Sequence, residues 1–223
     1  LSVLSGAAFA SDVYVGVEGG FQSLTSDMSV SVVDADGINQ GHNSSSATAD
    51  GGVGDVFVGV VSQPIPHKMS LALEANLTGF SAETSASYYD NYTDFTARTQ
   101  WKYNFGVSLI PGYLLTDTTT IYARMGIGNV DQFAPAQNIP GYLGDFTDHD
   151  FSYRLGAGVE TAITPKWHVR LEYDYWHYNA VDPDDFSNEN ENVVSYTFHP
   201  SSNTVMLGVS YYFYQSGGAD LVL

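Results

Sequence analysis

Residues 205–213, VMLGVSYYF, carry the clearest structural signal in the chain. Side chains of an extended strand alternate between its two faces. One face of this stretch is therefore wholly apolar or aromatic, and the other is mostly small or polar. The apolar face consists of Val205, Leu207, Val209, Tyr211 and Phe213. This pattern is typical of a membrane-spanning β-barrel strand, which has lipid outside and a packed, polar lumen inside.

Similar alternation recurs along the chain, less cleanly in the second segment, and predicts further strands over residues 12–24, 53–63, 69–82, 95–115, 119–129, 150–164 and 167–179. Each strand is long enough to cross hydrocarbon when tilted, which takes about 9–11 residues. Polar connections over 25–52, 83–94, 130–149 and 181–200 are long, and the connections between them are short turns. The sequence therefore predicts an all-β fold over residues 11–213: an eight-stranded antiparallel up-and-down transmembrane β-barrel, with both termini on the short-turn side.

Composition excludes several classes of function. The 223 residues suit one domain, and 25 acidic against 7 basic residues give a net charge of −18, which disfavours nucleic acid as a partner. The chain has no Cys, so it forms neither disulfides nor thiolate metal sites. Its histidines lack metal-ligand spacing, and we predict neither a metal site nor a cofactor.

The two ends of the chain are expected to lie outside the barrel. Residues 1–10, LSVLSGAAFA, end in an A-x-A-like cleavage site and are interpreted as the remnant of a signal peptide, with the mature protein starting near Ser11. An ordinary first strand is the alternative interpretation of this segment. Residues 214–223 are expected to form a C-terminal tail after the last strand.

Two stretches carry a family resemblance. The ending Val209, Tyr211, Phe213 resembles the terminal strand that the barrel-assembly machinery recognises in bacterial outer-membrane β-barrels. Residues 14–22, YVGVEGGFQ, resemble the first strand of the eight-stranded family that includes the OmpA-like transmembrane domain and OmpX. The resemblance implies a Gram-negative outer-membrane location with both termini periplasmic, contact with lipid and lipopolysaccharide, and an assembly signal at those three residues.

The charges of the strands fall on the face opposite to the apolar one. A Lys or Arg on the lipid face would cost about 2–4 kcal/mol at mid-depth. Because an eight-stranded lumen is just wide enough to be filled by side chains, opposite charges inside it must pair. The sequence therefore predicts a lumen plugged by an ion-pair network. Asp55 is an additional candidate, because the alternation in its segment is less regular. The predicted network is Glu18, Glu74, Arg98, Lys102, Arg124, Arg154, Glu160, Arg170, Glu172 and Asp174.

The function predicted from these features is a non-enzymatic surface barrel whose long acidic extracellular loops serve adhesin-like interactions, with a host or phage ligand as the partner. One alternative is a lipid-modifying hydrolase, since residues 198–203, FHPSSN, resemble the lipid A deacylase barrels through His199 and Ser201. No downstream Glu orients that His, and a triad without its third group is poorly activated. A narrow pore for small or hydrophobic solutes is another alternative, and a soluble β-sandwich is the non-membrane rival.

Overall fold

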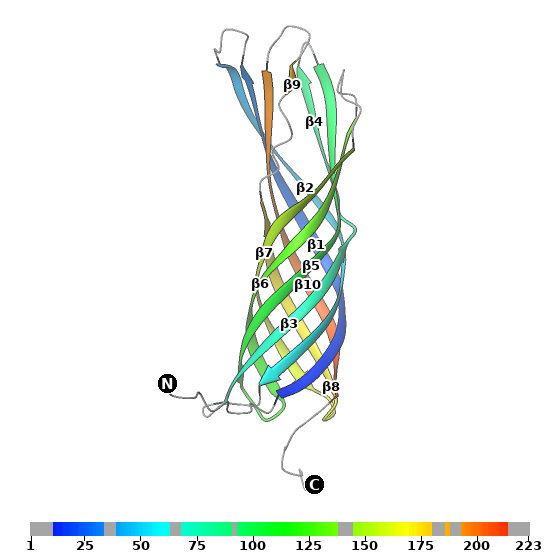
Figure 1. Ribbon diagram of the computed structural model, residues 1–223, viewed down its shortest axis with the longest axis vertical. Coiled ribbons are helices and arrows are strands. Elements are labelled where there is room, and N and C mark those ends of the chain that lie inside the picture. Colours follow the sequence, from blue (N-terminus) through cyan, green and yellow to red (C-terminus); the bar gives the residue numbers. More distant parts are fainter. Residues whose placement is uncertain are drawn as a thin grey trace, which may run out of the picture.

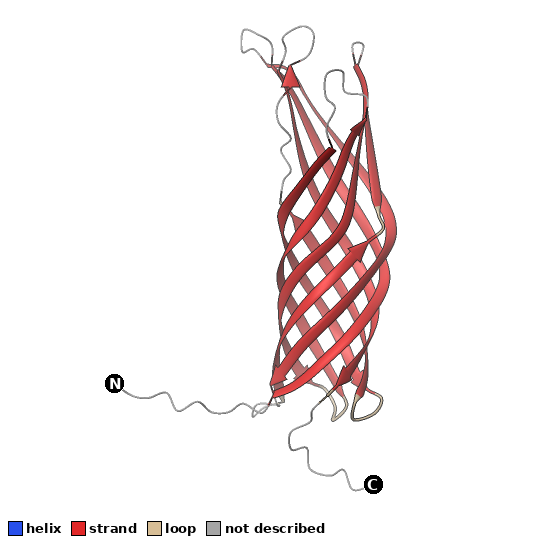
Figure 2. Ribbon diagram, turned by 45° about the vertical axis from the view of Figure 1, so that its right-hand side comes forward, coloured by secondary structure: helices blue, strands red, loops and turns tan. Residues whose placement is uncertain are grey.

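The computed structural model describes residues 11–33, 39–62, 68–90, 93–137, 145–179, 186–187 and 193–213. The predicted signal remnant, residues 1–10, and the predicted tail, residues 214–223, lie outside the described residues. Nearly all of the described chain is β-strand, and short loops join the strands (Figure 2). Among these residues, no helix is long and apolar enough to cross a membrane.

Eight strands close into a cylinder in which every neighbouring pair is antiparallel (Figure 1). They are β1 (Ser11–Val33), β2 (Asn39–Ser62), β3 (Met69–Phe80), β5 (Thr93–Leu114), β6 (Thr119–Gln137), β7 (Asp145–Ala162), β8 (Trp167–Tyr178) and β10 (Val193–Tyr212). Two shorter strands lie beyond the ring: β4 (Glu83–Asp90) pairs with β5, and β9 (Phe186–Ser187) pairs with β10. The predicted eight-stranded up-and-down barrel is confirmed.

Residues 205–212 close the cylinder. Residues 205–212 of β10 pair with β1 on one side, where Val205 lies opposite Phe21, and with β8 on the other, where Leu207 lies opposite Leu171. Because the first and last strands pair, the cylinder has no free edge and its backbone groups are satisfied within the sheet. A closed sheet of this kind is one of the two structures that can span hydrocarbon.

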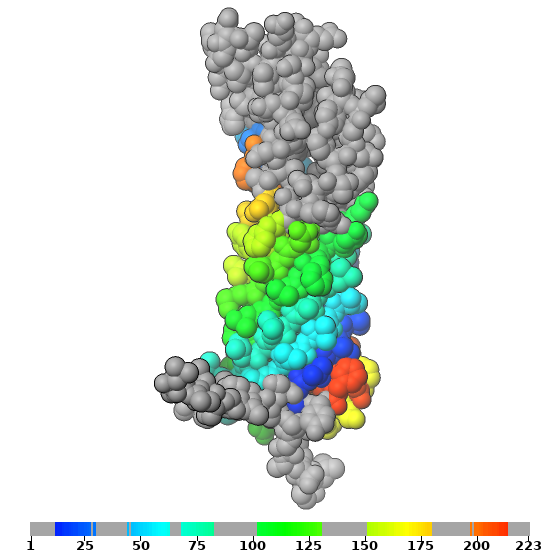
Figure 3. All heavy atoms as spheres, in the orientation of Figure 1, coloured from blue at the N-terminus to red at the C-terminus, as the bar shows by residue number. Residues whose placement is uncertain are grey.

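The two faces of the wall divide as the alternation predicts. Leu71, Val107 and Leu171 are 43%, 42% and 49% exposed, whereas Arg124 and Arg154 are each only 1% exposed. Figure 3 shows one side of the outer wall, where side chains of β3, β5 and β6 lie next to one another in strand order. The exposed apolar side chains therefore belong to the outside of the cylinder, and the arginines to its lumen.

The two ends of the cylinder differ, and we call them the turn end and the hairpin end. The turn end carries the short turns 115–118 and 163–166, in which the hydroxyls of Thr116 and Thr164 accept the backbone N–H of Thr119 and Trp167, each at 3.0 Å. Both the start of β1 and the end of β10 lie there (Figure 1). The opposite, hairpin end carries β4, β9 and the far ends of the long strands.

The predicted loops were wrong in their extent. Residues 25–52 are mostly strand, because β1 and β2 stay paired from Thr25 opposite Thr48 to Val33 opposite Asn39. Strands also occupy parts of the other three predicted loops, over 83–90, 130–137, 145–149 and 193–200. Apolar alternation arises only where one face of a strand contacts lipid. A hairpin that extends beyond the apolar band can be polar on both faces while its backbone pairing continues, so the pattern misses it.

Candidate functional site

Three arginines lie inside the cylinder, one on each of three consecutive strands. Arg124 of β6, Arg154 of β7 and Arg170 of β8 occupy inward positions of their strands and are at most 2% exposed. Five carboxylates that are at most 6% exposed surround them, namely Glu18, Asp55, Glu74, Glu172 and Asp174. We call these eight residues the arginine network. They come from six of the eight strands of the ring.

Glu74 joins two of the arginines. Its Oε1 lies 2.6 Å from Nη1 of Arg124, and its Oε2 lies 2.9 Å from Nη1 of Arg170. Arg170 reaches onward to Glu18 of β1, where Nη2 pairs with Oε1 and Nε donates to Oε2 at 3.1 Å. Two parallel contacts from one guanidinium to one carboxylate are the geometry that makes such pairs strong and directional. This half of the network connects β1, β3, β6 and β8.

Arg154 holds the second half of the network together. Its Nη2 lies 2.5 Å from Glu172 Oε1 and 2.6 Å from Asp174 Oδ2, and its Nη1 lies 3.5 Å from Asp55 Oδ2. Glu172 also lies 2.9 Å from Nε of Arg124, so it links the two halves. The eight charged side chains therefore form one connected set that crosses the lumen.

Hydroxyl groups of neutral side chains donate further hydrogen bonds to the carboxylates of the network. The hydroxyl of Tyr14 donates to Glu74 Oε2 at 3.0 Å, and that of Tyr122 donates to Glu172 Oε2 at 2.6 Å. Asp55 accepts a hydrogen bond of 3.0 Å from the Thr78 hydroxyl. Five carboxylates face three guanidinium groups, so these hydroxyl donors stabilise negative charge that the arginines alone do not balance.

Apolar layers lie on both sides of the arginine network. The layer toward the hairpin end contains Phe80, Trp176 and Tyr178, in which the Phe80 and Trp176 rings meet edge to face with centroids 5.9 Å apart. The layer toward the turn end contains Tyr14 and Phe57. Each layer also contacts a guanidinium: Arg154 lies 4.7 Å above the Trp176 ring, and Arg170 lies 3.6 Å above Phe57.

Glu160 was predicted in the network, but it lies in a separate group at the turn end. The Tyr212 hydroxyl donates to its Oε1 at 2.7 Å, and Nδ1 of His168 lies 2.8 Å from the same oxygen. Its side chain is 14% exposed, whereas every carboxylate of the arginine network is nearly inaccessible. His168 was not predicted as a site residue, although alternation along β8 places it on the same face as Arg170.

Two further members of the predicted network, Lys102 and Arg98, lie on β5. Lys102 is exposed, like its neighbour Tyr103, although alternation should place one of the two inside. The β5–β6 register shifts between Trp101 and Tyr103, and such a bulge changes the face on which the following side chains lie. The prediction that Lys102 lies in the lumen was therefore wrong. Arg98 belongs to β5, but its side chain lies outside the described part of the structure.

The predicted assembly signal lies on the outer wall at the turn end. Val209 is 39% exposed and Phe213 is 56% exposed. The Tyr211 ring lies between two others, with its centroid 5.0 Å from that of Trp167 and 5.1 Å from that of Phe213. These residues form an aromatic patch of the kind that sits at a membrane–water interface.

The candidate hydrolase residues do not form a catalytic group. His199 is exposed and lies opposite Asp27 of β1, and Ser201 lies opposite His177 of β8. Among the described residues, no hydrogen bond or ion pair joins His199 to Ser201 or to Asp27, so the described structure does not show the contacts that activate a catalytic serine. The described residues also contain no group of three or more His, Asp or Glu side chains that could hold a metal ion.

Comparison with known proteins agrees with the barrel fold. The family model of the outer membrane protein beta-barrel domain matches residues 1–213. Outer membrane protein A of Shigella flexneri is 37% identical over 113 residues, which are 50% of this chain and 29% of that protein. Outer membrane protein A of Citrobacter freundii is 38% identical over 114 residues, which are 50% of this chain and 41% of that protein. The match thus spans less than half of the length of these relatives.

A solved structure shares the fold. The outer membrane protein OprG from Pseudomonas aeruginosa superposes with a TM-score of 0.54 at 14% identity, covering 92% of this chain and 97% of that one. Identity this low supports the fold alone. The family match over nearly the whole chain, together with the closed cylinder and its apolar outer wall, shows that the chain belongs to the outer membrane protein β-barrel family.

Proposed function

We propose that this chain is a non-enzymatic surface barrel of the bacterial outer membrane, whose lumen is closed by the arginine network. The observation that carries the proposal is the burial of Arg124, Arg154 and Arg170, each paired across the lumen with carboxylates of other strands. A water-filled pore would need free space where these side chains and the two apolar layers lie.

The pairs that span the lumen explain why it stays closed. Arg124 of β6 pairs with Glu74 of β3, and Arg154 of β7 pairs with Asp55 of β2, so each pair joins strands that are not neighbours in the ring. Separating one buried pair costs about 3–5 kcal/mol. A conformation with one pair broken is then about 10²- to 10⁴-fold less populated than the closed one.

The orientation of the barrel belongs to the same proposal. Outer-membrane barrels have short periplasmic turns and longer extracellular connections, so the turn end faces the periplasm, together with the start of β1 and the end of β10. The apolar wall then contacts outer-membrane lipid and lipopolysaccharide, and the patch Val209, Tyr211 and Phe213 is available to the barrel-assembly machinery. The acidic hairpins extend outside the cell, where they offer an adhesin-like surface to a host or phage ligand.

Single-channel recording in planar bilayers tests the closed lumen. We expect no porin-sized conductance steps from the pure, folded protein. Replacement Glu74→Ala should produce openings, because it removes the carboxylate that holds Arg124 and Arg170. Asp50→Asn, at an exposed position of β2 near the hairpin end, is the matched control and should stay silent. Stable porin-sized steps from the unaltered chain would contradict the proposal.

The absence of enzymatic activity is tested separately. Lipid A incubated with the folded barrel should keep all its acyl chains, because His199 and Ser201 lack both the mutual contact and the orienting acid that activate a nucleophile. Release of fatty acid that disappears in Ser201→Ala would overturn this part of the proposal and would favour the hydrolase.

A further inference from the structure

Asp174 differs from the other four carboxylates of the arginine network in one of its oxygens. Its Oδ2 lies 2.6 Å from Arg154 Nη2, but its Oδ1 is buried and has no hydrogen-bond partner among the described residues. Oδ1 lies over Gly156 of β7, in the space that a side chain of that residue would fill. A buried ionised carboxylate is costly unless it is fully paired, and the neutral acid avoids that cost.

One guanidinium serves three carboxylates on this side of the lumen. Nη2 of Arg154 lies 2.5 Å from Glu172 Oε1 as well as 2.6 Å from Asp174 Oδ2, so two carboxylates share one nitrogen. Nη1 of the same group lies 3.5 Å from Asp55 Oδ2. One positive charge does not balance three negative ones, and carboxylates that share a dry site bind a proton between them.

The other contacts of these carboxylates leave Asp174 as the group that takes the proton. Glu172 has a second guanidinium, because its Oε1 also lies 2.9 Å from Nε of Arg124. Asp55 accepts the Thr78 hydroxyl, whereas Asp174 has no such additional donor. With Asp174 neutral, four carboxylates face three guanidinium groups. The charged groups around it are Glu18 of β1, Asp55 of β2, Glu74 of β3, Arg124 of β6, Arg154 of β7 and, on its own strand β8, Arg170 and Glu172.

Buried acceptors for the proton lie on the next two strands. Thr204 of β10 lies opposite Asp174 in register, and Gln22 of β1 lies opposite Thr204. Thr204 and Gln22 are 1% and 2% exposed, and within the described structure the Thr204 hydroxyl and the Gln22 amide oxygen have no hydrogen-bond partner. Side chains directly opposite each other have Cβ atoms about 4.5–5.5 Å apart. This row therefore offers an acid O–H somewhere to donate, so a neutral Asp174 is not left unpaired.

We infer that Asp174 is a proton-binding site inside the lumen: at neutral pH the folded barrel holds it as the uncharged acid, with the proton on Oδ1 and with Oδ2 against Arg154. The acid donates to the Thr204 hydroxyl, which in turn donates to the Gln22 amide oxygen. Release of the proton would add a further negative charge to a closed lumen that is already negative. The inference rests on the arginine network that the proposed function also uses, but the two fail separately, because loss of this proton site would leave the lumen closed.

Infrared spectroscopy of the whole folded chain tests the inference, in an alkyl maltoside detergent that has no ester carbonyl of its own. The C=O of a carboxylic acid absorbs apart from ionised carboxylates and from backbone amides, so we expect one acid band at neutral pH. Carboxyl labelling of aspartate with a heavy carbon isotope should shift this band, and the same labelling of glutamate should not. Asp174→Asn should remove it. Since the labelling needs no substitution, it remains decisive where Asp174→Asn does not fold.

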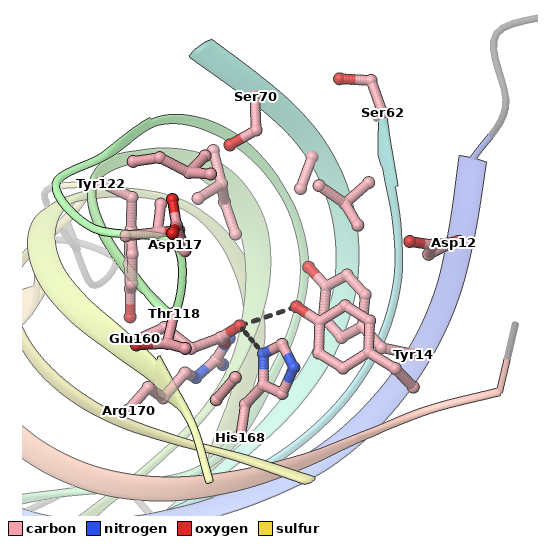
Figure 4. A pocket seen from close by; sticks show the side chains of 17 residues that line it. Asp12, Tyr14, Ser62, Ser70, Asp117, Thr118, Tyr122, Glu160, His168 and Arg170 are labelled. Carbon is pink, nitrogen blue, oxygen red and sulfur yellow. Dashed lines mark hydrogen bonds and ion pairs between the residues drawn. The ribbon is translucent and has the colours of Figure 1, made fainter. Parts of the chain in front are cut away.

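Glu160 at the turn end provides the matched control. Its Oε1 accepts the Tyr212 hydroxyl at 2.7 Å and lies 2.8 Å from His168 Nδ1, as the dashed lines of Figure 4 mark. Because this carboxylate has its own partners outside the arginine network, Glu160→Gln should leave the acid band unchanged. The inference is overturned by the absence of an acid band at neutral pH, by a band that persists in Asp174→Asn, or by a band that disappears in Glu160→Gln.

The pH dependence of unfolding measures the same proton independently. An Asp of an unfolded chain is ionised above about pH 4, so a proton held by folded Asp174 is released on unfolding. The stability of the unaltered chain then falls as the pH rises. From about pH 5 to about pH 7, its folding equilibrium constant should fall by up to about tenfold per pH unit relative to that of Asp174→Asn. Equal pH slopes in the two proteins would contradict a bound proton at this residue.

Discussion

Replacement of Glu74 is the perturbation to which the arginine network should respond most strongly. Its carboxylate is fully buried and accepts contacts from Arg124 at 2.6 Å, from Arg170 at 2.9 Å and from Tyr14 at 3.0 Å. Breaking a buried ion pair costs about 3–5 kcal/mol, and an orphaned buried hydroxyl adds about 1–3 kcal/mol.

Other contacts limit the loss. After Glu74→Leu, Arg124 still lies beside Glu172 and Arg170 still pairs with Glu18. We therefore expect the free energy of unfolding to fall by about 3–5 kcal/mol, rather than by the sum of all the broken contacts.

A double-mutant cycle separates pairing from packing. Arg124→Met alone should also cost about 3–5 kcal/mol, because it leaves the Glu74 carboxylate with one cationic partner fewer. Glu74→Leu combined with Arg124→Met removes both charges of the pair and leaves apolar side chains that fill the space. The double variant should therefore lose at least about 2 kcal/mol less than the sum of the two single losses.

The assay is equilibrium urea unfolding of the barrel in lipid vesicles, followed by tryptophan fluorescence, with heat-shifted gel migration as the check that each variant has folded. Additive losses in the double variant would show that Glu74 and Arg124 are not coupled. A loss below about 1 kcal/mol for Glu74→Leu would also contradict a buried ion pair, since that is the range of a solvated surface pair.

Three further predictions concern the wall and the last strand. Leu171→Arg on the outer wall should lower the free energy of unfolding in vesicles by about 2–4 kcal/mol, and a loss below about 1 kcal/mol would show that this position is not in lipid. Gly20→Ala should destabilise the barrel by about 1–3 kcal/mol in the same urea assay, because the new Cβ would collide with the backbone oxygen of Val205. Gly19→Ala is the control and should be near neutral, because its Cβ would lie 3.8 Å from the nearest atom. Phe213→Ala should reduce the amount of barrel in cell outer membranes, while unassisted refolding into detergent stays unchanged. Equal reductions in both would show that Phe213 serves folding in general and is not an assembly signal.

The strands and their inner charges were predictable because one physical period governs both. A residue two places from an outward Leu must also point outward, so Glu18, Arg124, Arg154 and Arg170 follow from the apolar residues around them. The outcome depends only on local sequence. It needs no knowledge of which strands become neighbours.

The partners within the network were not predictable, since they depend on register across the ring. Arg170 meets Glu18 only because the first and last strands close the cylinder. The hydroxyls of Tyr14 and Tyr122, which donate to the network, could have been singled out by their inward positions alone, as polar atoms among buried carboxylates.

Lys102 marks where the rule of alternation fails. A bulge inserts one residue into β5, so that side chains on the two sides of it no longer share a face, and nothing in the local composition indicates the insertion. The hairpins beyond the apolar band escape prediction for a related reason, because water on both faces leaves no periodic signal.

Site-directed spin labelling along β3 can show whether apolar side chains face lipid around a closed, charged interior. The chain contains no Cys, so each label can be attached at one chosen position. Labels at the outward Leu71, Leu73 and Leu77 should collide often with dissolved oxygen in vesicles, and labels at the inward Ala72 and Asn76 should collide rarely. An oxygen accessibility that does not alternate, or that peaks at Ala72 and Asn76, would contradict the account.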